Sequence, residues 1–405
     1  MRDNHDALGA NSDAEGAVTR AQGFSACGFT AGIKESGLPD LALLVSDRPA
    51  STAAVYTQNQ STAAPVHISK AHTANGSLRA AVVNSGNANC ATGEQGLADA
   101  REMTQLTASL IDCEADDVFV NSTGIIGHYL PMDLLRSAIP QLQPVPDGGA
   151  DFARSIMTTD TFQKEAVATF EANGVTYTVG GCAKGAGMIH PDMATMLAFF
   201  TTDAPVPADS LDACFRYAMD RSFNMVTIDG DTSTNDSAVI LANGAAGGEP
   251  LTGKSLKAFD SALLAVSTAL AKMMARDGEG ATKRISIKVS GTKTWEDARD
   301  VARTIAVSPL LKAALSKYDP NWGRILMAAG RAGVAYDLDR VRIWISDLCV
   351  FDGTATGVPE EEASAKTQGE EVFLRMDLGE GKAEATAWGC DLTEEYVRFN
   401  ADYVT

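Results

Sequence analysis

One dipeptide near the middle of the chain constrains the fold more than any other feature. Asn173-Gly174 joins two apolar runs, 166–172 and 175–179, and this pair favours a type I′ turn, whose twist matches that of two antiparallel strands. The rest of the chain alternates short strands with amphipathic helices, but it lacks the strict strand–helix–strand period of a parallel sheet. The sequence therefore predicts an α/β protein, a layered sandwich of mixed and antiparallel sheets with helices packed outside.

The spacing of apolar residues places the expected elements along the chain. Strands are predicted at 41–45, 53–56, 78–84, 117–120, 196–201, 285–290, 341–348, 371–376 and 382–388. Helices are predicted at 96–112, 131–142, 150–157, 208–221, 255–276 and 295–307. The strand-rich pattern continues to the last residue. Residues 1–23 are polar, acidic and rich in Ala and Gly, which predicts a disordered leader.

Charge and cysteine content exclude several classes of function. The chain contains 33 Lys and Arg against 52 Asp and Glu, a formal net charge of −19. So acidic a protein repels nucleic acid and anionic membranes, and neither partner is expected. No apolar run has the length or uniformity of a membrane span. The seven cysteines are scattered without a CxxC pair or zinc spacing, which favours buried apolar residues in a reducing cytoplasm and predicts no metal site.

The segment 180–200 holds the densest set of candidate functional residues. Gly185 and Gly187 lie in a glycine-rich stretch, but their spacing is not that of a nucleotide-binding loop. His190 and Asp192 lack the spacing of a metal motif. The segment instead places Thr195 at the start of a strongly apolar strand.

A threonine at such a position is a weak nucleophile unless a base lies beside it. If the preceding peptide bond is broken, the new α-amine of Thr195 can take the proton from its own hydroxyl. That amine titrates at about 7.7–8.0 in short peptides, close to a working pH. The cut begins when the hydroxyl attacks the carbonyl before it, and the small Ala194 helps the backbone to bend. The residues alone leave open a purely structural threonine, which is the commoner case.

A resemblance to a known family favours the catalytic interpretation. Residues 184–197 resemble the processing site of the ornithine acetyltransferase family, the bifunctional glutamate N-acetyltransferases. Further segments resemble the family in the same order and cover nearly the whole chain beyond the leader. They are 83–89, 121–127, 157–161, 222–224, 229–236, 277–283, 319–324 and 400–405.

The resemblance implies a reaction and a chain organisation. Self-cleavage between Ala194 and Thr195 would give an α chain of residues 24–194 and a β chain of residues 195–405. Thr195 would carry an acetyl group from N2-acetylornithine to glutamate by a ping-pong mechanism in arginine biosynthesis. Some members of the family also accept acetyl-CoA, and the sequence does not decide whether this chain does. No cofactor is implied, and the expected assembly is a heterotetramer of two α and two β chains.

The resemblance also assigns the site residues. Thr123 and Gly124 match an oxyanion hole, where fixed donors stabilise the charge that develops on the acetyl oxygen. Lys184 would bind the substrate carboxylate, and Glu279 would neutralise its ammonium. The positions that match substrate-binding residues are Thr158, Lys184, Thr195, Glu279, Asn400 and Thr405. For 229–236 and 319–324, both site support and rigid turns remain open.

Two other classes of protein fit parts of the sequence. A related self-cleaving amidohydrolase or aminopeptidase would also use Thr195, but it would deliver the acyl group to water. A non-catalytic binding protein of the same fold would be expected to have lost Thr195, Thr123 or Lys184, and all three are present.

Overall fold

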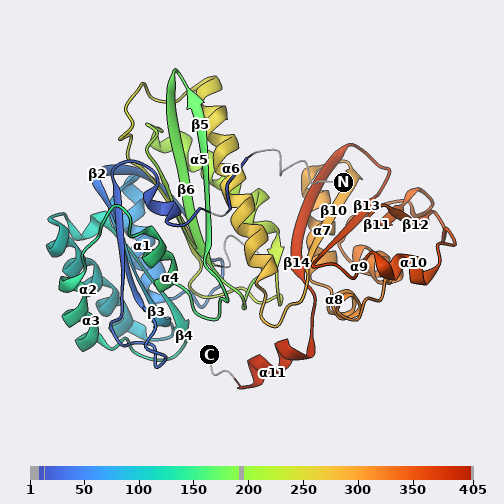
Figure 1. Cartoon of the computed structure of the whole chain (residues 1–405), viewed down its shortest axis with the longest axis horizontal. Helices are drawn as coiled ribbons and strands as arrows, with labels where there is room; N and C mark the ends of the chain where they lie inside the picture. The colour runs from blue at the N-terminus through green and yellow to red at the C-terminus, as the bar shows by residue number, and fades with distance from the viewer. Residues whose placement is uncertain (1–8, 13, 191–195, 403–405) are drawn as a thin grey trace.

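The computed structural model describes residues 9–12, 14–190 and 196–402. Within these residues the strands form two sheets (Figure 1). The first contains, in spatial order, β4 (Val118–Ile125), β3 (Ser77–Asn87), β2 (Leu41–Tyr56), β9 (Ser237–Ala242), β7 (Leu197–Thr202), β6 (Val175–Lys184) and β5 (Lys164–Ala172), with β1 (Phe24–Phe29) paired to β2. The second contains β12 (Leu348–Asp352), β11 (Arg342–Ile345), β13 (Glu371–Asp377), β10 (Arg284–Thr292), β14 (Ala383–Cys390) and β8 (Val226–Thr227).

The first sheet folds over on itself through β2. This strand shifts its register with β3 between Val45 and Ala50, and its second half pairs with β9 instead. Phe119 of β4 meets Phe199 of β7 edge to face, with ring centroids 6.1 Å apart. The two halves of the sheet therefore face each other across one shared apolar core.

Helices cover the outer faces of both halves, and other helices pack against β1 and β2 and against the second sheet. The helices are α1 (Ala64–His72), α2 (Gly93–Ile111), α3 (Met132–Ala138), α4 (Gly149–Ser155), α5 (Ala208–Arg221), α6 (Gly253–Arg276), α7 (Trp295–Ala306), α8 (Pro309–Ser316), α9 (Trp322–Ala329), α10 (Glu360–Ala365) and α11 (Glu394–Asp402). α1, α2 and α3 pack on the β3–β4 half, and α5 and α6 pack on the other. The order helix, sheet, sheet, helix confirms the predicted layered sandwich, and α6 also joins it to the second sheet (Figure 1).

The predicted hairpin is confirmed. β5 and β6 pair antiparallel down to Ala172 and Val175, and Asn173 and Gly174 have φ angles of 53° and 79°. A type I′ turn needs positive φ angles at both central residues, and Asn and Gly adopt such angles more readily than other residues do. The helix predicted at 208–221 has the bounds of α5.

Three expectations about local structure are wrong. The strand predicted to stop at Val120 continues through Thr123 and Gly124, because β3 runs alongside it and pairs with both residues. The segment 341–348 is not one strand; β11 and β12 form a hairpin that turns at Ser346, where φ is 56°. The last described residues form not a strand but the exposed helix α11, whose two leading glutamates suit a helix N-terminus.

The expected disordered leader is also wrong over the part of 1–23 that the structure describes. Ala17 and Val18, in a short 3₁₀ turn, and Ala21 are buried. The Ala17 N–H donates to Glu165 Oε2 at 2.8 Å. A Cβ at Gly180 of β6 would lie 1.9 Å from the Ala17 carbonyl oxygen. Glycine at this position therefore leaves room for the 3₁₀ turn to pack against the strand. These contacts make 14–23 part of the sandwich.

One described helix, α6, is long and apolar enough to cross a membrane by length and composition. Of its most apolar stretch, 67% is buried inside the protein, and one face packs on β5 and β6. Its apolar character is therefore explained by its place in the core, between the two sheets.

Candidate active site

A cavity of about 470 Å³ opens where the ends of β3, β4 and β6 meet the starts of β7 and β9. Every expected site residue that the structure describes lines it. They are Thr123, Gly124, Thr158, Lys184, Glu279 and Asn400. Ala194, Thr195 and Thr405 lie outside the described residues. Ile189 and Met196, which lie on either side of 191–195, both line the cavity.

The wall at the end of β4 carries the predicted oxyanion hole. Gly86 of β3 pairs with Gly124 in parallel register. Gly124 has a φ of 131°, and a Cβ there would lie 2.4 Å from the Gly86 carbonyl carbon. Glycine is therefore required by both the backbone angle and the close approach of the two strands. The exchange of either glycine would move the backbone that holds Thr123.

A lysine sets the direction of the Thr123 hydroxyl. Lys184, at the end of β6, donates from Nζ to Thr123 Oγ1 at 3.2 Å. An ammonium group can only donate, so Thr123 must accept this bond. Its own hydroxyl hydrogen is left to donate to another group. This is the donor that an oxyanion beside Thr123 requires.

Lys184 is a buried cation at the cavity wall. Burial lowers its pKa below the usual value, while the nearby carboxylates of Asp160, Asp236 and Glu279 favour the charged form. In the described contacts its ammonium hydrogen-bonds to the neutral hydroxyl of Thr123. A carboxylate ligand would therefore gain a charged partner in a site already removed from most water.

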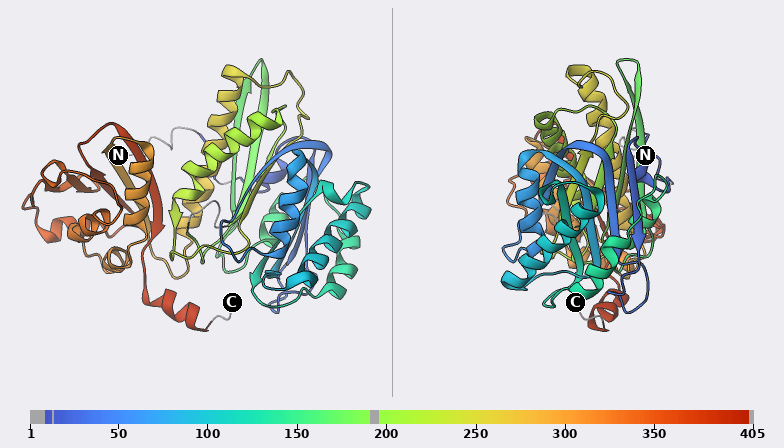
Figure 2. Two further views of the ribbon diagram at one scale, coloured as in Figure 1. Left: turned by 180° about the vertical axis from the view of Figure 1, so that it is seen from behind. Right: turned by 90° about the vertical axis from the view of Figure 1, so that its left-hand side faces the viewer.

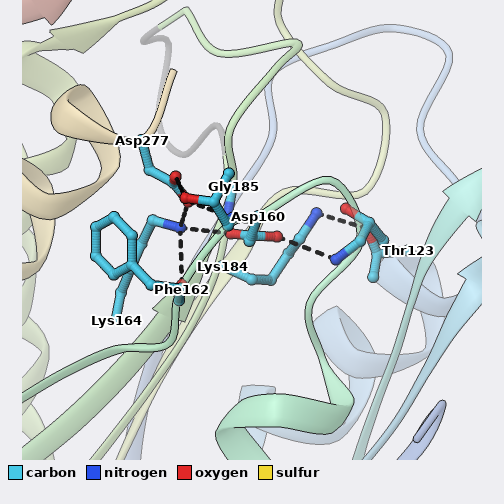
Figure 3. Close-up of polar contacts among 9 residues, drawn as sticks. Thr123, Asp160, Phe162, Lys164, Lys184, Gly185 and Asp277 are labelled. Atoms are coloured by element: carbon cyan, nitrogen blue, oxygen red, sulfur yellow. Dashed lines mark hydrogen bonds and ion pairs between the residues drawn. The ribbon is translucent and has the colours of Figure 1, made fainter. Parts of the chain in front are cut away.

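A buried ion network holds this lysine and its neighbours in place (Figure 3). Asp160 Oδ1 lies 2.6 Å from Lys164 Nζ and accepts a bond from the Gly185 N–H, also at 2.6 Å. Asp160 Oδ2 accepts from the Thr158 N–H at 3.0 Å. Lys164 Nζ is also 2.6 Å from Asp277. One carboxylate thus positions two segments of the cavity wall.

The electrostatics of Asp160 follow from this network. Burial alone would raise the pKa of Asp160, but Lys164 and Lys184 hold it below its usual range. Asp160, Lys164 and Asp277 were not among the predicted site residues. Asp160 and Asp277 do lie inside the motifs 157–161 and 277–283, so a signal was present, but single-residue matching passed over residues that support the wall from behind.

The chain end contributes from the second sheet's side. Asn400 of α11 donates from Nδ2 to Glu279 Oε2 at 2.9 Å. Glu279 is also fixed by its backbone, which donates to the Ala186 carbonyl at 2.9 Å. A Cβ at Gly187 would lie 2.3 Å from Glu279 Oε2, so this glycine leaves room for the carboxylate. In two views α11 extends away from both sheets near the cavity end of the sandwich (Figures 1 and 2).

The two unassigned motifs have different roles. In 229–236, the Asp229 carboxylate accepts bonds from the Met188 and Ile189 N–H groups at 2.6 and 2.8 Å. Burial raises its pKa, and these bonds oppose the rise. Most of this motif lines the cavity, so it supports the site. In 319–324, Asn321 caps α9 by accepting from the Arg324 N–H, and none of these residues lines the cavity.

Comparisons with known proteins identify the family of the chain. The family model described as the ArgJ family matches residues 25–405. The arginine biosynthesis bifunctional protein ArgJ of Symbiobacterium thermophilum is 49% identical over 397 residues, which cover 96% of this chain and 99% of that protein. The protein of the same name from Thermus thermophilus is 49% identical over 390 residues, with coverages of 96% and 100%. A crystal structure of ornithine acetyltransferase complexed with ornithine, from Mycobacterium tuberculosis, is 37% identical, covers 46% of this chain and all of that chain, and has a TM-score of 0.42.

Proposed function

The chain belongs to the ArgJ family and is an acetyltransferase of arginine biosynthesis; on that premise we propose that the cavity is its active centre and that Thr195 is the nucleophile. The reaction is transfer of an acetyl group from N2-acetylornithine to glutamate. The observation that carries the assignment is that Thr123, Gly124 and Lys184 all line one cavity. Ile189 and Met196, which lie on either side of 191–195, also line it. The hydrolase alternative is set aside because the relatives, matched over nearly their full length, are bifunctional proteins of arginine biosynthesis.

In the first half-reaction the donor's α-carboxylate faces Lys184 and its acetyl oxygen faces Thr123 and Gly124. The Thr195 hydroxyl attacks the acetyl carbon, and its proton passes to the α-amine of Thr195. The charge that develops on the acetyl oxygen is stabilised by the Thr123 hydroxyl and the Gly124 N–H. The C–N bond then breaks, the α-amine returns the proton to the leaving nitrogen, and ornithine departs from the acetyl-enzyme.

In the second half-reaction glutamate occupies the same cavity. Its α-amine attacks the acetyl carbon, the bond to Thr195 Oγ breaks, and the proton returns to that oxygen through the α-amine. Lys184 binds the α-carboxylate of either substrate, and Glu279 with Asn400 faces the ammonium of the ornithine side chain. Thr158 and the chain end at Thr405 complete the binding set.

The α-amine exists only if the chain is cut, so we expect self-cleavage between Ala194 and Thr195. The expected products are an α chain that ends at Ala194 and a β chain of residues 195–405. Intact mass measurement of the purified protein tests this directly. Thr195→Ala should give one uncut chain without transfer activity, whereas Thr195→Ser keeps a hydroxyl and should still be cut. A cut Thr195→Ala chain would exclude Thr195 as the processing nucleophile.

The α-amine also predicts a pH dependence. Because its pKa in short peptides is about 7.7–8.0, it becomes protonated and loses its function as a base towards pH ~6. The rate of transfer from N2-acetylornithine to glutamate, measured at saturating substrate across this range, should fall on acidification. A flat rate would count against the amine as the base.

Three broader features belong to the same proposal. Acetyl-CoA is a second donor, in keeping with the bifunctional relatives, and no cofactor takes part. The seven cysteines are free and mostly buried, which fits a reducing cytoplasm. Two α and two β chains form the assembly. Acetyl-CoA-dependent acetylation of glutamate and the mass of the particle by light scattering test these features separately.

A further inference from the structure

One acidic residue at the cavity has no part in the scheme above. Asp236 lies directly before β9, and the next residue, Ser237, pairs in parallel with Leu197 of β7. The Ser237 N–H donates to the Met196 carbonyl at 2.9 Å. Asp236 is therefore level with Met196, the first described residue after 191–195, and it lines the cavity. The fold places a carboxyl group beside the start of the strand that follows the nucleophile.

The carboxyl group of Asp236 is buried and only partly used. The residue is 3% exposed, and Ser233 binds the carboxyl group. No donor among the described residues reaches its Oδ2 atom. The neighbouring Asn235 is different, because its Nδ2 donates to both the Ala88 and Ser122 carbonyls. A buried carboxylate oxygen without a partner is unfavourable, and structural needs do not explain it.

Two opposing effects act on the pKa of Asp236. Burial raises its pKa well above the usual range, whereas Ser233 and the ammonium of Lys184 oppose the rise. A carboxyl group with a raised pKa keeps its proton at a higher pH than an exposed aspartate does, and a nearby ammonium favours its carboxylate form. Asp236 therefore has the properties of a proton donor and acceptor.

The transfer reaction needs a second group of this kind. Glutamate arrives with its α-nitrogen as an ammonium, which has no lone pair for attack on a carbonyl. It must lose one proton before the C–N bond forms and another as the bond forms. The α-amine of Thr195 takes the second proton and delivers it to Thr195 Oγ. The scheme so far contains no acceptor for the first.

We propose that Asp236 exchanges this first proton with the substrate amines, an inference that rests on the proposed function. In the second half-reaction its carboxylate takes a proton from the glutamate ammonium, which leaves a neutral amine and a carboxylic acid. In the next first half-reaction the carboxylic acid gives that proton to the departing ornithine amine, which leaves as an ammonium. Over one cycle a single proton moves from glutamate to ornithine, and Asp236 returns to its starting state.

The test separates proton removal from the other steps. 4-Nitrophenyl acetate can form the acetyl-enzyme without any amine leaving group, and hydroxylamine is an acceptor that is largely neutral at neutral pH. With Asp236→Asn we expect cleavage and the burst of nitrophenolate to resemble those of the wild type. Transfer to glutamate should fall on the order of 100-fold, while transfer to hydroxylamine should change by less than about threefold. Raising the pH should restore part of the glutamate rate, because more of the amine is then neutral.

Controls make each outcome decisive. Asp260→Asn removes another carboxylate that has a buried oxygen without a partner, but it lies in α6 away from the cavity lining, so transfer should be unchanged. If Asp236→Asn is not cut, Asp236→Glu keeps a carboxyl group and should retain a faster transfer to glutamate than Asp236→Gln. Equal losses with glutamate and hydroxylamine, or no loss with either, would overturn the role of Asp236. A wild-type chain that is neither cut nor acetylated would instead refute the proposed function.

Discussion

The two walls of the cavity hold their functional groups in different ways. The neutral wall consists of Thr123, Gly124 and Asn235, which line the cavity, and of the polar residues bonded behind them, Asn84, Asn87, Asn121 and Ser122. The charged wall consists of Lys184 and Glu279, which line the cavity, and of Asp160, Lys164 and Asp277 behind them. In the neutral wall, Ser122 Oγ donates to Asn84 Oδ1 at 2.6 Å and Asn84 Nδ2 donates to the Asn87 carbonyl at 2.9 Å. In the charged wall, Lys164 lies 2.6 Å from both Asp160 and Asp277.

This difference separates two tasks of one site. Neutral amides do not titrate, so the hydrogen bonds between the amides and hydroxyls of the neutral wall do not depend on pH. In the proposed mechanism the charged wall binds the charged ends of the substrate, and its groups act strongly because they are buried. The two meet at the single hydrogen bond from Lys184 to Thr123. Removing groups from each wall should therefore affect stability, kcat and KM differently.

The largest effect is expected from breaking the charged wall at its centre. Asp160→Asn leaves a neutral amide beside Lys164 and keeps only one acceptor oxygen for the Thr158 and Gly185 N–H groups. Loss of one partner from a buried ion network costs about 3–5 kcal/mol, so the free energy of unfolding in urea should fall by this order and activity should be lost. Glu102→Gln is the control, because its ion pair with Arg136 is exposed and should contribute little. An unchanged midpoint for Asp160→Asn would contradict the role of the network.

The same network predicts how stability depends on pH. The pKa of Asp160 is lowered in the folded protein, so its contribution is present above the pKa of the unfolded chain and is lost as the pH falls through the folded value. The charged wall should stay intact between pH ~6 and ~8. A loss of activity in that range would then come from groups outside this network, the α-amine, whose pKa is higher, or Asp236, whose pKa is raised by burial.

The neutral wall should respond in kcat rather than in stability. Thr123→Val keeps the shape of the side chain but removes the hydroxyl that faces the acetyl oxygen. Loss of one such donor costs about 2.7–4 kcal/mol of transition-state stabilisation, or roughly 100- to 1,000-fold in kcat. Thr123→Ser restores the hydroxyl and should recover most of the rate. Steady-state kinetics with N2-acetylornithine would contradict the assignment if Thr123→Val changed KM alone.

Where the walls meet, both parameters should change. Lys184→Ala removes the partner of the substrate carboxylate, so KM should rise, and an unchanged KM would contradict its binding role. The same substitution frees the Thr123 hydroxyl to rotate, so kcat should also fall, by less than in Thr123→Val. Lys184→Arg keeps the charge but not the geometry of a single ammonium, and it should recover binding more than kcat.

The sequence predicted the residues that line the cavity better than those that support them from behind. Asn173-Gly174 and the apolar runs identify the sandwich because turns and periodicity are local signals. Thr123 and Gly124 were identified because residues 121–127 resemble a motif of the family. Asp160 and Lys164 are four residues apart, but Asp277, which directly follows α6, lies 113 residues beyond Lys164 in the chain. Pairing at that distance has no local signature, and burial of the leader against Gly180 was missed for the same reason.

The smallest effect is expected at the chain end, which extends the charged wall. Asn400→Ala removes one amide from Glu279, a bond that is exposed to solvent. A bond of this kind contributes well below the ~1 kcal/mol typical of intramolecular hydrogen bonds, so the urea midpoint should be unchanged. Glu279 keeps its backbone bond to Ala186 but loses the group that orients its carboxylate. KM for N2-acetylornithine should therefore rise a few-fold at constant kcat, with Arg398→Ala on the same helix as the control. If kcat fell instead, Asn400 would affect the reacting atoms. α11 would then have to be grouped with the neutral wall rather than with the charged wall.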